Sequence, residues 1–208
     1  IFALLGANGA GKTTTLECLE GCALMTAAAL WSLENGGIQL QSASLPGYLQ
    51  CREAVQLFAK WNHVPVDTAM LAALGIPDLA KKRYNTLSTG QKRRLHLALA
   101  LLGHPDTIFL DEPTAGLDPR ERVRFRNLIH TLAEDRIVIL STHIVSDIET
   151  IAGQIVMFKD HRLYCCDSPA RICARFQGRV FQLPAGTPLA PGQFLLSEGQ
   201  GADGPVLR

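Results

Sequence analysis

The chain has 208 residues, of which 47% are hydrophobic, and its formal net charge is +1. A chain of this length can bury a core of its own without disulfides or metal ions. Because binding a phosphate backbone needs a strongly basic surface, the near-neutral charge argues against nucleic acid as the main partner.

The six cysteines form no C-x-x-C pair, and no histidines cluster beside them. We therefore expect no zinc site but the reduced cysteines of a cytosolic protein. The most apolar stretches, residues 22–30 and 95–102, fall short of the roughly 18 to 20 residues that a membrane-spanning helix needs. No signal peptide is visible at the start of the chain. If the protein serves a membrane, we expect it to be peripheral and to work from the cytoplasmic face.

Four apolar runs predict buried strands, at residues 1–5, 107–110, 137–140 and 155–158. The first three are apolar on both faces, which is typical of central strands in a covered parallel sheet. The fourth turns through residues 159–161 into a further strand-like run. Helical patterns lie between the strands, so the fold class is α/β and layered.

The middle of the chain predicts only helices, at residues 52–61, 67–74 and 89–102, the last two ending at Gly-x-Pro segments. This pattern indicates a helical subdomain, over about residues 51–105, inserted between strands of the sheet. The tail is rich in Gly and Pro, with one strand-like run at residues 193–196. We predict an ATP-binding domain over residues 1–180 and a C-terminal extension over residues 181–208.

The first strand leads into a segment that matches G-x-x-x-x-G-K-[ST], namely Gly6-Ala7-Asn8-Gly9-Ala10-Gly11-Lys12-Thr13. Its glycines let successive backbone N–H groups converge on phosphate oxygens, and the helix that follows adds the positive end of its dipole. Lys12 is expected to reach the β- and γ-phosphates, and the Thr13 hydroxyl to hold Mg²⁺. A glycine-rich turn without this function would leave the lysine unexplained.

Two further strands end in polar residues. Asp111 and Glu112 follow the second strand, and His143 follows the third. The carboxyl ends of parallel strands face the crevice in which the phosphate loop also lies. Asp111 is expected to hold Mg²⁺ through its water shell, Glu112 to orient or deprotonate the attacking water, and His143 to contact the γ-phosphate. The alternative is that the two acids are turn residues before Pro113 and that the histidine is an ordinary core or surface residue.

The segment LSTGQKRR, residues 87–94, opens the helix at residues 89–102. Ser88 and Gln91 have the spacing of a capping box. A cap alone does not favour Gly90, nor three cations in the first turns, where they oppose the helix dipole. Both features are expected if this helix start faces the phosphates of a nucleotide.

With these motifs in order, the sequence resembles the nucleotide-binding domain of ABC transporters over roughly residues 1–175, and LSTGQ is a variant of that family's LSGGQ signature. Asp118 in AGLD resembles the D-loop, His143 the switch histidine, and Gln41 the glutamine of the Q-loop. Gln39 and Gln50 are alternatives to Gln41. Asp118 also suits a helix N-terminus. The runs STGQKRR, EPTAGLDP and STHIVSDIE most resemble the bacterial ABC-2 type, often exporters.

The resemblance implies a RecA-like P-loop NTPase that hydrolyses ATP with Mg²⁺, with Glu112 and His143 as catalytic residues. The implied magnesium ligands are Thr13, Gln41 and Asp111. The implied nucleotide contacts are Gly6, Ala7, Asn8, Gly9, Ala10, Gly11, Lys12, Thr13, Thr14, Ser88, Gly90, Gln91 and Asp118. In that family the signature binds the ATP of the opposite subunit, so the implied unit is a head-to-tail homodimer. The implied membrane partner is a permease that docks on the helical subdomain and performs transport, with export favoured.

The sequence departs from the family pattern at its start. The family has strands before the phosphate loop, with an aromatic residue that stacks on adenine, and the chain begins after that point. Residues 22–37 are also short, with AAAL at residues 27–30 where a small antiparallel sheet is usual. We therefore expect an incomplete domain. Thr89 in place of glycine is a milder departure.

Two other functions compete with transport. Soluble ABC ATPases that act on DNA or ribosomes usually carry a long coiled-coil insertion or a second cassette, and neither is seen in these 208 residues. A module that switches on ATP without hydrolysing it would not need Glu112 and His143.

Overall fold

The computed structural model describes residues 1–19, 36–39, 44–177, 183–184, 198–201 and 204–207. The chain divides into two compact units, Ile1–Ser168 and Pro169–Arg208. Within the described residues, no helix is both long and apolar enough to cross a bilayer.

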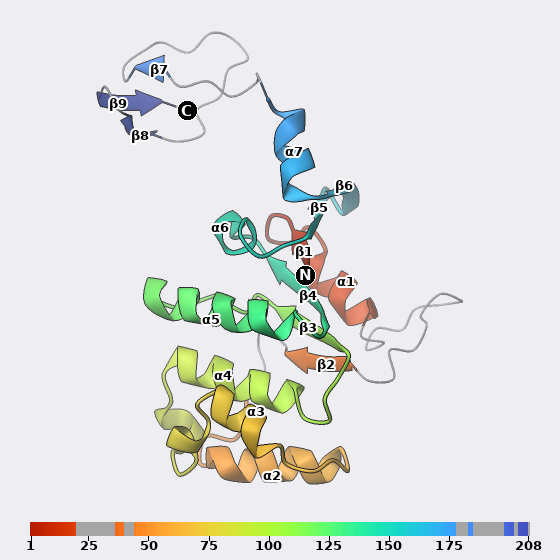
Figure 1. Cartoon of the computed structure of the whole chain (residues 1–208), viewed down its shortest axis with the longest axis vertical. Helices are drawn as coiled ribbons and strands as arrows, with labels where there is room; N and C mark the ends of the chain where they lie inside the picture. The colour runs from red at the N-terminus through yellow and green to blue at the C-terminus, as the bar shows by residue number, and fades with distance from the viewer. Residues whose placement is uncertain (20–35, 40–43, 178–182, 185–197, 202–203, 208) are drawn as a thin grey trace. The chain divides into compact units, whose positions relative to one another are not determined.

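The first unit is built on a six-stranded sheet with the strand order β2-β3-β4-β1-β5-β6 (Figure 1). All neighbouring strands are parallel except β5 and β6. The predicted α/β fold with a mostly parallel sheet is confirmed. The strands are β1 (Phe2–Leu5), β2 (Gly36–Gln39), β3 (Thr107–Asp111), β4 (Ile137–Thr142), β5 (Gln154–Lys159) and β6 (Arg162–Asp167).

Strand β2 is absent from the sequence prediction, and its glycines explain why. A Cβ atom on Gly37 would lie 2.1 Å from the Ala100 carbonyl oxygen and 2.8 Å from Pro105 Cγ. The close approach of α4 therefore requires glycine in a strand, where glycine normally weakens the strand pattern. Such a contact between distant segments leaves no local signal in the sequence.

The three helices predicted for the middle of the chain, α2 (Cys51–Trp61), α3 (Thr68–Ala73) and α4 (Thr89–Ala100), lie within one or two residues of their predicted bounds. The other helices, whose bounds were not predicted, are α1 (Lys12–Leu19), α5 (Pro119–Leu132), α6 (Val145–Ile148) and α7 (Pro169–Arg175), and 3₁₀ turns lie at Pro77–Leu79 and Tyr84–Thr86. Asp67 begins α3 as its cap, because its Oδ1 accepts from the backbone N–H groups of Ala69 and Met70. Helices α2, α3 and α4 lie together beyond β2 (Figure 1).

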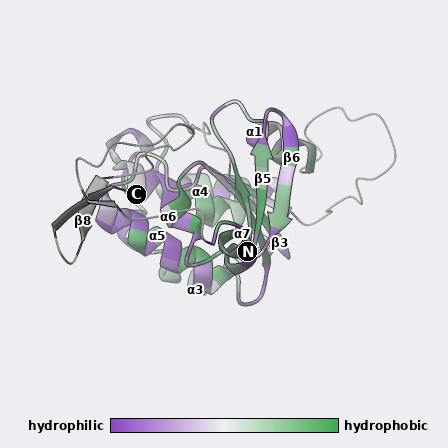
Figure 2. Ribbon diagram, turned by 90° about the horizontal axis from the view of Figure 1, so that it is seen from above, coloured by the Kyte–Doolittle hydropathy of each residue, from purple (hydrophilic) through white to green (hydrophobic). Residues whose placement is uncertain are grey.

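Apolar side chains from α1 and the strands close the core around Leu4, Leu16 and Phe109. Every residue of β3 is buried, and the strands of the sheet carry mostly hydrophobic residues (Figure 2). This burial holds α1, and with it the segment before it, against the sheet.

The second unit contains α7 and a three-stranded antiparallel sheet of order β7-β9-β8. Its strands are β7 (Leu183–Pro184), β8 (Glu198–Gly201) and β9 (Gly204–Leu207). The strand-like run at residues 193–196 lies outside the described residues. The first unit ends at Ser168, and the boundary at residue 180 stays a prediction.

Tyr84 and His96 of α4 form a buried polar pair. The Tyr84 hydroxyl lies 3.0 Å from His96 Nε2, and the two rings stack with centroids 5.6 Å apart. Burial, together with the positive charges of Arg93 and Lys92, lowers the pKa of His96 to about 4. His96 is therefore neutral in the folded protein near pH 7.

This neutral histidine predicts acid sensitivity. The ordinary pKa of histidine is 6.5 and that of folded His96 is about 4, so between these values the unfolded chain binds a proton that the folded chain does not. The free energy of unfolding should fall as pH decreases from 6.5 towards 4, by up to about 1.4 kcal/mol per pH unit. Urea denaturation at several pH values would show this slope reduced in His96→Gln but retained in the exposed control His130→Gln. An equal slope in both variants would contradict the assignment to His96.

Candidate active site

The loop between β1 and α1 has the backbone that its glycines predict. Gly9 and Gly11 have φ angles of 79° and 98°, which lie in the left-handed region that glycine adopts without steric cost. Gly6 is packed tightly, because a Cβ atom there would lie 3.0 Å from the Phe158 carbonyl oxygen. The loop is thus fixed at its start by β5 and at its end by α1.

Lys12 is buried and its ammonium group crosses the loop. Its Nζ donates to the carbonyl oxygens of Gly6, at 2.9 Å, and Ala7, at 3.1 Å. The same atom lies 3.7 Å from Glu112 Oε1. The charge of the lysine is therefore balanced by the carboxylate of the residue that directly follows β3, one hundred residues along the chain.

A hydroxyl from each of two elements contacts Asp111 at the end of β3. Thr13 Oγ1 donates to the Asp111 carboxylate, at 3.1 and 3.2 Å from its two oxygens. Ser141 Oγ of β4 donates to Asp111 Oδ1 and accepts from the Glu112 backbone N–H, at 3.0 Å. Among the described residues no cluster of three or more His, Cys, Asp or Glu could hold a metal ion. One hydroxyl and one carboxylate fit Mg²⁺, which binds few protein oxygens and completes its shell with phosphates and water.

Glu112 has an unusual backbone and an unevenly partnered carboxylate. Its φ angle is 46°, uncommon outside glycine and a form of strain that concentrates at functional sites. Its Oε1 atom lies 2.9 Å from His143 Nδ1. Its Oε2 atom is buried, and no hydrogen-bond partner for it exists within the described part of the chain. This carboxylate is fixed through one oxygen and has the other oxygen available to accept a proton.

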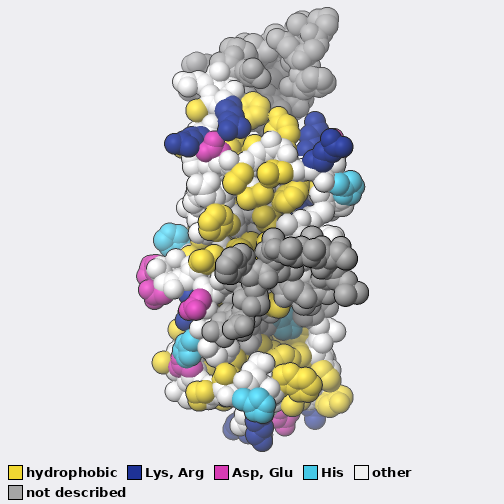
Figure 3. Space-filling model, turned by 90° about the vertical axis from the view of Figure 1, so that its right-hand side faces the viewer, with side chains coloured by type: hydrophobic (Ala, Val, Ile, Leu, Met, Phe, Trp, Pro, Cys, Tyr) yellow, Lys and Arg dark blue, Asp and Glu magenta, His cyan; other side chains and the backbone are white. Residues whose placement is uncertain are grey.

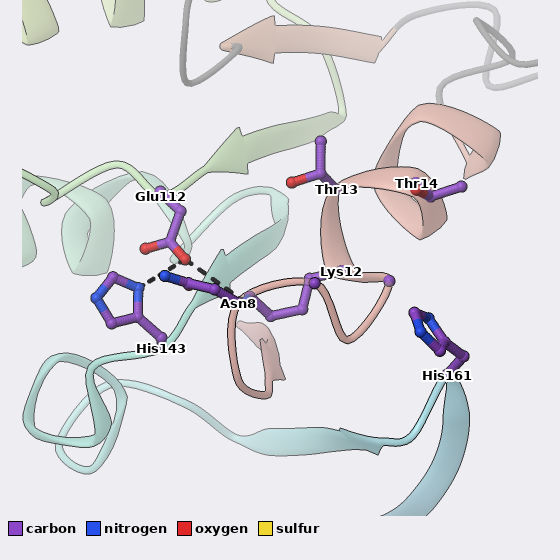
Figure 4. A pocket seen from close by; sticks show the side chains of 9 residues that line it. Asn8, Lys12, Thr13, Thr14, Glu112, His143 and His161 are labelled. Carbon is purple, nitrogen blue, oxygen red and sulfur yellow. Dashed lines mark hydrogen bonds and ion pairs between the residues drawn. The ribbon is translucent and has the colours of Figure 1, made fainter.

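Residues of the loop and of α1, together with Glu112 and His143, line one pocket of about 400 Å³, whereas Asp111 and Ser141 are not part of its lining (Figure 4). The structure thus brings together the loop, Glu112 and His143 as the sequence predicted, and it adds His161, which the sequence analysis had only placed in a turn between strands. The lining residues are Asn8, Gly9, Gly11, Lys12, Thr13, Thr14, Glu112, His143 and His161.

Ser88, Gly90, Gln91 and Asp118 do not line this pocket. Ser88 Oγ accepts from the Gln91 backbone N–H, and Gln91 Oε1 accepts from the Ser88 backbone N–H, both at 3.2 Å. The capping box is therefore real. Asp118 Oδ1 accepts from the Glu121 backbone N–H at 2.9 Å and caps α5. Roles of these residues towards a nucleotide stay predictions.

The cations that follow Gly90 have partners inside the chain. Lys92 Nζ lies 5.0 Å from the centroid of the Tyr84 ring. Arg93 is buried, and burial lowers the pKa of its guanidinium although the nearby Asp111 carboxylate opposes that effect. At least two of the three cations are therefore explained without a nucleotide.

Of the three glutamines considered as magnesium ligands, the structure describes two. Gln41 lies outside the described residues. Of the alternatives, Gln39 is buried at the end of β2 with both amide atoms lacking a hydrogen-bond partner in the described structure. Gln50 lies at the start of α2, where its backbone N–H donates to Glu53 at 2.9 Å.

With this geometry established, comparison with known proteins decides the family. The chain matches the family described as ABC transporter over residues 1–115. It belongs to the ABC transporter family. It is an ATP-binding domain of that family, and its fold and pocket are those of an ATPase.

The curated relatives are much longer proteins of the A subfamily. The chain is 34% identical to rat ATP-binding cassette sub-family A member 7, over 84% of the chain and 9% of the relative. It is 32% identical to Arabidopsis thaliana ABC transporter A family member 9, over 100% of the chain and 23% of the relative. It is 33% identical to human phospholipid-transporting ATPase ABCA7, over 97% of the chain and 10% of the relative. The chain therefore spans between about a tenth and a quarter of these relatives.

The Ser141 hydroxyl predicts the cost of disturbing the site. Ser141→Ala removes one of the donors to Asp111 and one of two acceptors for the Glu112 N–H, the other being the Ser141 backbone carbonyl oxygen at 3.2 Å. Leaving buried polar groups short of partners should lower the free energy of unfolding by about 1–3 kcal/mol. Urea denaturation checks this, with the exposed Ser146→Ala as control. An unchanged stability in Ser141→Ala would show that the bridge contributes nothing to the fold.

Proposed function

We propose that this domain binds ATP and Mg²⁺ in the pocket, hydrolyses the ATP together with a second nucleotide-binding domain, and thereby powers transport through a transmembrane permease. The observation that carries the hydrolytic part is the Glu112 carboxylate. Its Oε1 is held by His143 and faces Lys12, while its Oε2 is buried without a partner in the described structure. Oε2 is the atom that would take a proton from the attacking water.

The loop would hold the triphosphate. Lys12 Nζ now donates to the carbonyl oxygens of Gly6 and Ala7, and we infer that it exchanges these for β- and γ-phosphate oxygens. Backbone N–H groups of residues 6–14 would bind the remaining oxygens. Thr13, Asp111 and Gln41 would hold Mg²⁺, which offsets phosphate charge. His143 would contact the γ-phosphate while orienting Glu112.

We propose a second nucleotide-binding domain because the signature residues do not line the pocket of their own chain. Ser88, Gly90 and Gln91 are outside it, and the first turn of α4 keeps N–H groups that can bind an anion. A head-to-tail pair would place this helix start of one copy over the ATP of the other. A homodimer is the simplest such arrangement, and Asp118 would lie at its interface.

The transport role follows the relatives. All of the relatives reported above are A-subfamily proteins, so we propose an A-type transporter, with the bacterial ABC-2 type kept as a sequence-based prediction. The name of the human relative, phospholipid-transporting ATPase, favours a phospholipid cargo. Export stays the direction that the sequence resemblance predicts. We place the domain at the cytoplasmic face of the cell membrane, docked through the helical subdomain.

Glu112→Gln tests the proposed base. The amide keeps the shape of the side chain but cannot accept the proton, so ATP turnover should fall by about 10²- to 10⁴-fold. Phosphate release measures this loss of turnover. The ATP-bound dimer should accumulate, and size-exclusion chromatography in the presence of ATP measures it. The exposed control Glu134→Gln should behave as wild type. Normal turnover in Glu112→Gln would remove Glu112 from the mechanism.

Mixing two inactive variants tests the shared site. Lys12→Ala should abolish phosphate binding. Gly90→Ala should leave the fold stable, because the atom that the new Cβ would meet is the carboxylate end of the flexible Glu121 side chain and alanine favours a helix. Each variant alone should lose activity by on the order of 100-fold.

The mixture of the two should recover part of the activity. A mixed dimer contains one site in which both the loop and the signature are intact, whereas neither parent contains any. ATPase assays of the mixture against each variant alone provide the measurement. If mixing restores nothing although the variants form mixed dimers, each copy works alone and the shared site is wrong.

A further inference from the structure

His161 lies in a turn that is fixed against the phosphate loop. Strand β5 pairs with β1, with Met157 opposite Leu5, so the two strands end at the same edge of the sheet. β5 continues to Lys159, which pairs with Arg162 of β6. Asp160 and His161 are therefore the two central residues of a tight turn, and the packing of Gly6 on Phe158 keeps this turn beside the loop.

The turn carries a side chain at its second central position, where glycine is preferred. Asp160 and His161 have φ angles of 50° and 57°, and a two-residue hairpin turn with positive φ at both positions prefers Asn-Gly or Asp-Gly. An imidazole here stands where glycine would be the least strained choice. The side chain at residue 161 thus has no explanation in the local backbone.

The imidazole faces the pocket at the end away from the reacting groups. His161 lines the pocket, and its Nδ1 lies 3.9 Å from the position that a Cβ atom on Gly11 would occupy. Figure 4 shows it on the opposite side of Lys12 from Glu112 and His143. Its ring is exposed, and it forms no ion pair, hydrogen bond or ring contact with any other described residue.

The direction of a bound nucleotide follows from these positions. The γ-phosphate must lie beside Glu112 and His143, where the water attacks. The phosphate chain then runs along Lys12 and Thr13, so the adenosine end leaves the pocket on the side of Thr14 and His161.

We propose that the His161 ring packs against the adenine base and contributes to nucleotide affinity. This inference rests on the proposed function, because it needs ATP in the pocket in the stated direction. A flat aromatic ring offers a stacking surface to any base. His161 is then a binding residue for the adenosine part of the nucleotide and takes no part in hydrolysis.

The test compares ADP with pyrophosphate, which lacks the adenosine. Isothermal titration calorimetry of the 208-residue chain with Mg²⁺ would use three variants. His161→Gly and His161→Asn suit the backbone of the turn, and His161→Tyr keeps an aromatic ring. The matched control is Asp160→Gly, which changes the neighbouring turn residue without touching the pocket lining. Lys12→Ala reports on phosphate binding.

We expect His161→Gly and His161→Asn to weaken ADP binding by roughly 3- to 10-fold and to leave pyrophosphate binding unchanged. His161→Tyr should keep most of the ADP affinity, Asp160→Gly all of it, and Lys12→Ala should lose both ligands. Unchanged ADP affinity in His161→Gly would overturn the inference, as would an equal loss for ADP and pyrophosphate, or full rescue by asparagine. If the wild type binds neither ADP nor pyrophosphate, the proposed function itself is wrong, and the inference about His161 fails together with it.

Discussion

The active site depends on the parallel pairing that aligns the ends of β1, β3 and β4. Asp111 lies opposite Ser141, and Leu5 opposite Thr142, so the segments that follow these strands meet at one edge of the sheet. The Ser141 hydroxyl joins two of the strands, since it donates to Asp111 and accepts from the Glu112 N–H. A shift of register by one residue would turn these side chains to the other face. The sheet therefore fixes the chemistry of the pocket.

Burial of opposite charges imposes a second constraint. Lys12 and Glu112 have side chains that are each 6% exposed, and a buried charge without a partner is costly. Each of the two is therefore held by the other and by polar atoms nearby. Glu112 satisfies this balance through Oε1 alone, and the strained backbone at its Cα aims the carboxylate into the pocket. Oε1 thus takes part in the charge balance, and Oε2 is the atom to which we assign the proposed proton transfer.

The signature segment shows how one sequence pattern can satisfy two demands. Ser88 and Gln91 cap α4, Lys92 lies over Tyr84, and Arg93 is buried near Asp111. These contacts explain most of the segment within one copy of the chain. Gly90 is different, because the nearest atoms that a Cβ there would meet belong to the flexible Glu121 side chain. Its lack of a side chain is consistent with the proposed approach of a second domain.

The sequence alone determined the α/β class, the phosphate loop, the positions of the carboxylates at the end of β3 and of His143 after β4, and the helices between β2 and β3. Each of these depends on local pattern, namely strand runs, helix periodicity and glycine spacing. The tertiary structure decided the rest. Strand β2 needs Gly37 to fit against Ala100, Ser141 acts through strands brought together by pairing, and His161 reaches the pocket through a hairpin about 150 residues after the loop. Contacts between segments far apart in the chain set these positions, and no local pattern encodes such contacts.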